Sequence, residues 1–162
     1  MELIPLGKGA KSDGLLVIVD YAHTPDALQK TLQAIRPIAD QRHGKIWCVF
    51  GCGGDRDVGK RSKMGTVAEQ LADQIIITSD NPRTENPLEI INMIRAGMAH
   101  DASNIQMIAD RAAAIMAAVR HADAQDIVLV AGKGHETSQE INGKKFDFSD
   151  QEHILLAAGG AV

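Results

Sequence analysis

Charged and glycine-rich segments follow four of the five apolar runs that predict buried β-strands in this chain. The runs span residues 15–20, 45–50, 74–78, 105–108 and 126–131. The polar segments span residues 20–25, 51–61, 79–83 and 132–136. In open parallel sheets, ligands bind outside the carboxyl ends of the strands, so we expect one edge of the sheet to form a binding site.

The glycine-rich segment 51–61 nearly matches a phosphate-binding loop, with the pattern G-x4-G-K at positions 54–60. Arg61 stands where that pattern needs Ser or Thr to hold magnesium, and Asp55 and Asp57 would place negative charge where phosphates sit. We therefore reject the phosphate-binding reading. The mixture of acids and bases suits a ligand that carries both charges, although these side chains could instead pair with one another.

The run Asp80-Asn81-Pro82-Arg83 is a second candidate. Asn81 precedes a proline, which favours extended geometry and a turn at this point. The turn would project Asp80 and Arg83 from one rigid corner. A carboxylate and a guanidinium held together can bind the ammonium and the carboxylate of the same ligand. A surface Asp–Arg pair in front of a helix is an equal alternative.

The segments after the last and the first strand complete the predicted edge. Gly132 would let a ligand approach the backbone, and Glu136 is a second possible anchor for an ammonium group. Asp20 and His23 follow the first strand, where an acid commonly meets ribose hydroxyls, although Asp20 could instead cap the next helix. The roles of two further residues in these segments stay open: Lys133 and His135.

Strand-like runs alternate with amphipathic segments, which predicts an α/β fold. We expect a three-layer, Rossmann-like arrangement: a mainly parallel sheet of about six strands, helices on both faces and an antiparallel C-terminal hairpin at the edge. The hairpin turns at Asn142-Gly143. Residues 1–14 resemble an irregular lead-in to a domain spanning 15–162. Helices are expected from Thr24-Pro25, over 62–71, from Asn86 to about 98, over 111–122, and from Ser149 to about 158.

Composition and charge exclude several classes of protein. The chain has 162 residues, of which 44% are hydrophobic and 23% charged. This balance excludes a disordered or fibrous chain. A net charge of −4 without a basic block argues against nucleic acid and anionic membranes as partners, and an aromatic content of 3% argues against base-stacking platforms.

The cysteines and the apolar stretches indicate the compartment. Cys48 and Cys52 lack the second Cys or His pair of a zinc site, so we expect no metal ligands and two free thiols in a reducing environment. No apolar stretch approaches the roughly 20 residues that a membrane span needs. We therefore expect a cytoplasmic protein without membrane insertion.

Four motifs together resemble one family. They are DYAHTPD at 20–26, the loop 51–61, DNPRTE at 80–85 and GKGHE at 132–136. In this order they resemble the C-terminal domain of the Mur ligases. The similarity is to the members that add meso-diaminopimelate to UDP-N-acetylmuramoyl-alanyl-glutamate in peptidoglycan synthesis. It extends over essentially the whole chain.

The resemblance implies an ATP-dependent amide-forming ligase of three domains, of which this chain is the third. The absent central domain would carry the phosphate-binding loop and the Mg²⁺ ligands, with residues 1–14 leading in from it. This domain would bind the amino acid and close over ATP, and it would be inactive alone. The implied partners are meso-diaminopimelate, ATP, the UDP-N-acetylmuramoyl-dipeptide and the rest of its own chain.

The resemblance also implies roles for individual residues, none of them catalytic or metal-binding. In the family, the DNPR form of the motif accompanies meso-diaminopimelate, whose distal carboxylate gives Arg83 a partner that lysine lacks. Two other readings stay open: a stand-alone α/β module that binds a nucleotide or small anion, and a protein-interaction platform. The implied amino-acid site comprises Arg56, Asp80, Asn81, Pro82, Arg83, Gly132 and Glu136. The implied nucleotide contacts are Asp20 and His23.

Overall fold

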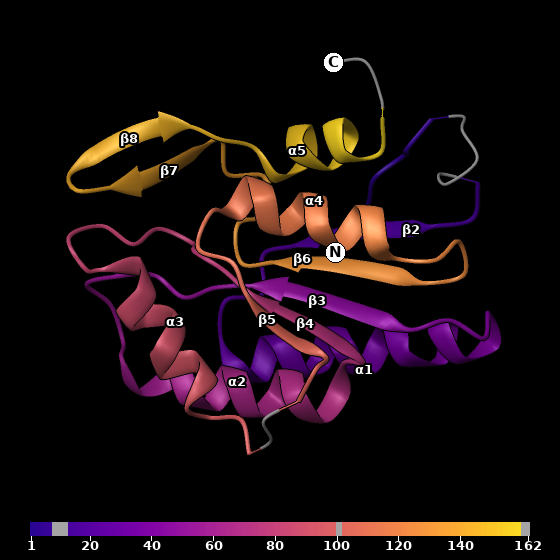
Figure 1. Ribbon diagram of the computed structural model, residues 1–162, viewed down its shortest axis with the longest axis horizontal. Helices are drawn as coiled ribbons and strands as arrows, with labels where there is room; N and C mark the ends of the chain where they lie inside the picture. The colour runs from indigo at the N-terminus through magenta and orange to yellow at the C-terminus, as the bar shows by residue number, and fades with distance from the viewer. Residues whose placement is uncertain (8–12, 100–101, 160–162) are drawn as a thin grey trace.

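The computed structural model describes residues 1–7, 13–99 and 102–159. Its main sheet has the strand order β1-β2-β6-β3-β4-β5 (Figure 1). Only β1 runs antiparallel to its neighbour, and the other pairs are parallel, which confirms the mainly parallel sheet of about six strands. The strands are β1 Glu2–Leu3, β2 Leu16–Asp20, β3 Ile46–Phe50, β4 Gln74–Ile77, β5 Ile105–Met107 and β6 Ile127–Ala131.

Helices cover both faces of the sheet, as expected. Figure 1 shows α1, α2 and α3 on one face and α4 and α5 on the other. Hydroxyl, amide and carboxylate side chains cap α1, α3, α4 and α5 by accepting backbone N–H groups of the first turn, because these N–H groups have no partner within the helix. The helices are α1 Pro25–Gln41, α2 Gly59–Leu71, α3 Pro87–Arg95, α4 Arg111–His121 and α5 Asp150–Ala157.

The central strands are buried on both faces, which explains their continuous apolar sequence. In β3, Cys48 and Phe50 pack into the cluster formed with α1, α2 and α3, whereas Trp47 and Val49 pack into the cluster formed with α4 and α5. All four side chains are buried. Successive residues of a strand therefore pack into two separate cores. Because the central strands are parallel, their carboxyl ends lie at the same edge of the sheet.

The C-terminal hairpin forms, but not where we expected it. β7 (Ser138–Ile141) and β8 (Lys144–Asp147) make a separate two-stranded sheet. Asn142 and Gly143 take the positive φ angles that their turn requires. Placing this hairpin at the edge of the main sheet was wrong. Turn residues determine that a hairpin forms, but they do not determine which part of the fold it packs against. Here β7 lies against the 80–83 segment through a bridge between Arg83 and Ile141.

The antiparallel edge of the main sheet is instead β1, which lies within the expected irregular lead-in. Ile4 donates its backbone N–H to the Val17 carbonyl at 2.9 Å, and the side chains of Ile4 and Leu6 are buried. The expectation of an irregular segment is therefore wrong for Glu2–Leu3, whereas residues 4–7 have no regular secondary structure and residues 8–12 lie outside the described part.

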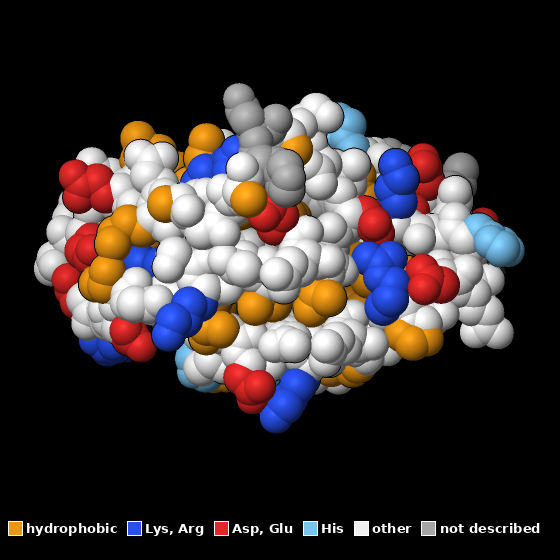
Figure 2. Space-filling model, turned by 90° about the horizontal axis from the view of Figure 1, so that it is seen from below, with side chains coloured by type: hydrophobic (Ala, Val, Ile, Leu, Met, Phe, Trp, Pro, Cys, Tyr) orange, Lys and Arg blue, Asp and Glu red, His pale blue; other side chains and the backbone are white. Residues whose placement is uncertain are grey.

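The outer surface carries charges of both signs. Figure 2 shows acidic and basic side chains interspersed with small apolar areas on the face that lies at the bottom of Figure 1. Within the ranges that the structure describes, no helix is both long and apolar enough to cross a bilayer.

Candidate ligand-binding site

The segments that follow β2, β3, β4 and β6 enclose a cavity of about 470 Å³. All four segments had been predicted to share one edge of the sheet. The cavity brings together most of the residues proposed from sequence and adds several more. Its lining residues are Tyr21, His23, Thr24, Gly53, Arg56, Asp57, Lys60, Asp80, Asn81, Arg83, Gly132 and Glu136.

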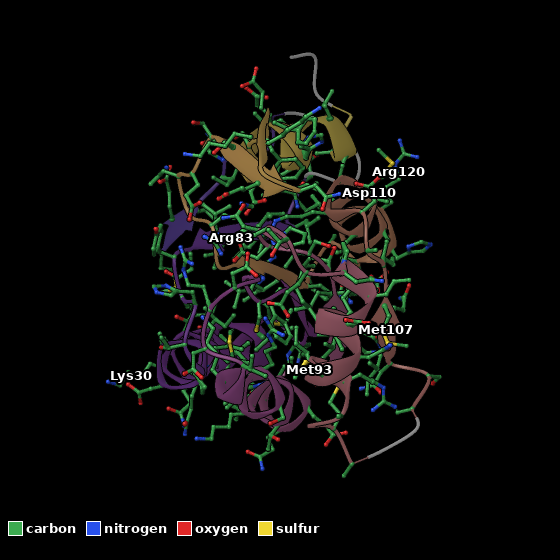
Figure 3. All side chains as sticks on the ribbon, turned by 90° about the vertical axis from the view of Figure 1, so that its left-hand side faces the viewer. Lys30, Arg83, Met93, Met107, Asp110 and Arg120 are labelled. Carbon is green, nitrogen blue, oxygen red and sulfur yellow. The ribbon has the colours of Figure 1, made fainter. Side chains whose placement is uncertain are left out.

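Arg83 is held firmly at the cavity wall. Its backbone has a positive φ of 52°. Its Nη1 donates to the Gly54 carbonyl at 2.9 Å, and its Nε lies 3.3 Å from a carboxylate oxygen of Glu140. A Cβ on Gly53 would lie 2.9 Å from Nη1, so glycine at position 53 makes room for the guanidinium. In Figure 3, Arg83 lies over the body of the molecule, whereas Lys30 points outward from α1.

The β7–β8 hairpin holds the DNPR corner through its backbone and through the side chains of Gln139 and Glu140. Gln139 Nε2 donates to the Asp80 carbonyl at 2.7 Å. Arg83 donates its N–H to the Glu140 carbonyl at 2.9 Å, and Asn142 donates its N–H to the Arg83 carbonyl at 2.7 Å. The hairpin is therefore part of the site's framework, which sequence reasoning missed because it placed the hairpin at the sheet edge.

The two acids proposed as ammonium anchors line the same cavity. Gly132 has a φ of +116°, and a Cβ there would lie 2.8 Å from Asp80 Oδ2. Glycine thus makes room for the carboxylate of Asp80, a function the sequence had not indicated. The carboxylate of Glu136 raises the pKa of Tyr21 above its ordinary value, through charge repulsion and by accepting a hydrogen bond from the phenol.

The charges of the glycine loop do not mainly pair with one another. Asp55 accepts the hydroxyl of Thr84 at 2.7 Å, and Arg61 forms a 2.7 Å ion pair with Glu85. Lys60 donates to the His23 carbonyl at 2.7 Å. The loop is therefore joined to the DNPRTE segment on one side and to the exit of β2 on the other.

The two residues implied to contact nucleotide occupy different positions. His23 lines the cavity, and its Nδ1 lies 2.8 Å from the Tyr21 carbonyl. Asp20 is not among the lining residues. It accepts the Thr31 hydroxyl at 2.6 Å and lies 3.1 Å from the Met1 ammonium. Burial alone would raise the pKa of Asp20, but the hydrogen bonds from Thr31, from the Tyr21 N–H and from the amino terminus, together with the charge of that terminus, outweigh it and lower the pKa.

Pro82 and His135 also lie outside the lining set. The Pro82 carbonyl packs closely against Gly54, where a Cβ would approach it to 1.9 Å, so glycine at position 54 lets the two backbone segments meet. His135 is exposed and lies 2.7 Å from the carboxylate of Glu2.

The cavity is lined by further residues that were not assigned to the site from sequence, and buried side chains support it from behind. Tyr21 and Thr24 lie in a segment already marked as polar, so their position was a usable signal. Lys133 lies in a predicted strand exit, where its role stayed open, whereas no sequence signal marked Arg111; both side chains are buried behind the cavity. The additional lining residues are Tyr21, Thr24, Gly53, Asp57 and Lys60.

The described residues offer neither a metal-binding cluster nor a reactive thiol. Among the described residues, no group of three or more His, Cys, Asp and Glu side chains could hold a metal ion. Cys48 and Cys52 are free thiols, as expected. Both are buried, and burial raises the pKa of each to about 12. Neither thiol has the lowered pKa of a nucleophilic cysteine.

The amino-acid sequence of this chain matches a known family. The family model described as Mur ligase, glutamate ligase domain matches residues 6–134, which is well over half of the chain. The chain therefore belongs to the Mur ligase family.

Individual relatives are more specific. The chain is 62% identical over 145 residues to the UDP-N-acetylmuramoyl-L-alanyl-D-glutamate--2,6-diaminopimelate ligase of Ralstonia nicotianae, covering 90% of this chain and 28% of the relative. It is 56% identical over 147 residues to the ligase of that name from Janthinobacterium sp., covering 91% and 29%. A solved structure of a ligase of that name aligns with a TM-score of 0.83 and 45% identity, covering 91% and 30%. The chain thus spans less than a third of the length of these relatives.

Proposed function

We propose that this chain is the amino-acid-binding domain of an ATP-dependent ligase that adds meso-diaminopimelate to UDP-N-acetylmuramoyl-alanyl-glutamate. The relatives carry that activity in their names, and the chain matches them over about nine-tenths of its own length. The complete enzyme would be a cytoplasmic protein of peptidoglycan synthesis.

The observation that carries the proposal is the pairing of opposite charges in one cavity. Asp80 and Glu136 offer carboxylates, and Arg56 and Arg83 offer guanidinium groups. Meso-diaminopimelate has an amino and a carboxylate group at each end. One end of this ligand would fit the cavity if its ammonium group lay between Asp80 and Glu136 and its carboxylate lay on Arg83. A guanidinium can bind a carboxylate through two parallel hydrogen bonds.

The chain would contribute binding and orientation to the reaction. In this type of reaction, the substrate carboxylate is activated as an acyl phosphate, which the amino group of the incoming amino acid attacks. Fixing one end of the amino acid aims its free amino group and converts a bimolecular step into an effectively unimolecular one. The isolated domain would be inactive, since no residue assigned here is catalytic.

ATP would be shared with the rest of the enzyme. His23 lines the cavity, and Asp20 lies at the exit of the same strand, so we keep both as candidate nucleotide contacts. The described residues lack a cluster that fits a metal ion. We therefore place the Mg²⁺ ligands, which would neutralise phosphate charge, outside this chain.

The test is Arg83→Ala in the complete enzyme. Loss of a charged hydrogen-bond partner should raise KM for meso-diaminopimelate by about 10- to 100-fold, with KM for ATP almost unchanged. Arg120→Ala is the matched control, because Arg120 is exposed on α4 and is not among the cavity-lining residues. Equal loss for both substrates would refute the assignment of Arg83.

Calorimetry with the 162-residue chain separates the ligand classes. We expect binding of meso-diaminopimelate and weaker or no binding of lysine, which lacks the distal carboxylate. Equal binding of lysine would contradict the specificity. Binding of simple anions alone would favour the stand-alone anion-binding module.

A further inference from the structure

The ammonium of Lys133 lies behind the cavity at the meeting point of three proposed site residues. The Lys133 side chain has no solvent exposure. Its Nζ donates to Asn81 Oδ1 at 2.8 Å and lies 3.4 Å from Asp80 Oδ1 and 3.9 Å from Glu136 Oε2. It also donates to the Ser138 carbonyl at 3.0 Å, where β7 begins. A buried cation needs such partners because desolvation opposes its charge.

The contact with Asn81 determines which end of its amide meets a ligand. Two donors reach the same oxygen: Lys133 Nζ at 2.8 Å and the backbone N–H of Glu140 at 3.0 Å. An amide nitrogen in that position would face two donors, so the oxygen must point inward. The Nδ2 amino group is then the end that faces the cavity, which Asn81 lines. Asn81 therefore offers hydrogen-bond donors to a carboxylate.

The same ammonium lies between the two carboxylates of the site. Asp80 is 7% exposed, and a second negative charge nearby would destabilise it without a cation. Lys133 approaches Asp80 and Glu136 from the buried side, so their opposite sides stay available to a ligand ammonium. Arg111 and Arg61 are also buried, but Arg111 is paired with Asp150 and Arg61 with Glu85.

We propose that Lys133 is a positioning residue for the amino-acid site, which fixes the Asn81 amide with its donors toward the ligand and holds Asp80 and Glu136 in place as ammonium acceptors. This role rests on the proposed function, because it serves recognition of an amino acid. Lys133 does not line the cavity and touches the ligand only through these three residues.

The first test is Lys133→Met in the complete ligase, which removes the charge and keeps an unbranched side chain. We expect KM for meso-diaminopimelate to rise by about 10- to 100-fold, because a buried carboxylate loses its cation and Asn81 loses its fixed orientation. We expect kcat at saturating meso-diaminopimelate, and KM for ATP and the UDP-dipeptide, to change less than about threefold. Lys30→Met is the control, since Lys30 is an exposed residue of α1 with one surface ion pair.

In a folded Lys133→Met variant, an equal rise of all three KM values would overturn the positioning role, as would unchanged use of meso-diaminopimelate. If the unaltered ligase does not use meso-diaminopimelate at all, the proposed function itself fails. The two failures are therefore distinguishable.

The second variant, Asn81→Asp, keeps the test decisive if Lys133→Met does not fold. Aspartate retains the oxygen that accepts Lys133 and the Glu140 N–H, and it replaces only the outward amino group by a carboxylate oxygen. We expect thermal stability to be retained while KM for meso-diaminopimelate rises by at least about tenfold, because a donor becomes a charged acceptor. A large loss of thermal stability, or unchanged KM, would overturn the orientation assigned to Asn81.

Discussion

The guanidinium of Arg111 and the carboxylate of Asp150 form a two-point ion pair with no solvent exposure. Nε lies 2.7 Å from Oδ1, and Nη2 lies 2.8 Å from Oδ2. Arg111 also donates to the carbonyls of Ser79 at 3.0 Å and Ala131 at 3.2 Å. The first residues of α4 and α5 are thereby joined to the two strand exits that carry Asp80 and Gly132.

Breaking this pair should destabilise the fold strongly. Asp150→Asn leaves a buried guanidinium without its anion, and we expect a loss of about 3–5 kcal/mol in the free energy of unfolding. Urea denaturation measures it. Asp147→Asn on the exposed β8 is the control and should cost little. Similar midpoints for the two variants would show that the pair contributes no more than a surface charge.

Gly132→Ala should damage ligand binding specifically. The new methyl group would lie 2.8 Å from Asp80 Oδ2, and the φ of +116° would strain any side chain. Asp80 must then move, so we expect affinity for meso-diaminopimelate in calorimetry to fall at least about tenfold. Gly143→Ala also has a positive φ, but its Cβ would meet open space. It should lose stability without losing affinity, and equal affinity losses would contradict the role assigned to Gly132.

Arg61 and Glu85 should make stability depend on acid pH. Hydrogen bonds from Arg61, helped by the Asp55 N–H, lower the pKa of Glu85 from 4.5 to about 2. A lowered pKa means that the folded state favours the carboxylate, so its stabilisation is fully present above about pH 4.5 and is lost as the pH falls toward about 2. The difference in urea midpoint between the unaltered chain and Glu85→Gln should therefore shrink over this range. A difference that does not vary with pH would contradict it.

The thiols should be unreactive in the folded chain. Burial raises the pKa of Cys48 and Cys52 to about 12, so almost no thiolate exists near pH 8. We expect Ellman's reagent to label neither residue in buffer and both in guanidinium chloride. Cys48→Ala and Cys52→Ala identify which thiol reacts. Fast labelling of either thiol in buffer would contradict the burial.

The secondary structure was largely predictable because its signals are local. The apolar run 126–131 had to be a strand buried on both faces, and β6 is one. The caps at Asn86 and Ser149 start α3 and α5 as predicted. Helix α2 begins at Gly59, three residues before the predicted start. The start was missed because the N-cap residue, Val58, forms no side-chain capping bond and so gives no sequence signal.

The framework of the site was less predictable. The strand exits were recognised because parallel strands place their carboxyl ends at one edge. The docking of β7 on the DNPR corner was missed, and so was the position of Asp20, which is bound to Thr31 and does not line the cavity. Neither follows from spacing, because both depend on packing between distant segments.

The sequence by itself determined the alternation of strands and helices, the charged strand exits and the two unpaired thiols, since periodicity, capping and burial act over a few residues. Only the tertiary structure decided which carbonyls and carboxylates the buried cations meet. Lys133 and Asn81 are 52 residues apart in the chain, and only the shared edge of the parallel sheet, where β4 and β6 both end, brings their side chains to 2.8 Å. A lysine in a polar loop usually remains in water, and this one is buried because the folded chain surrounds it with acceptors.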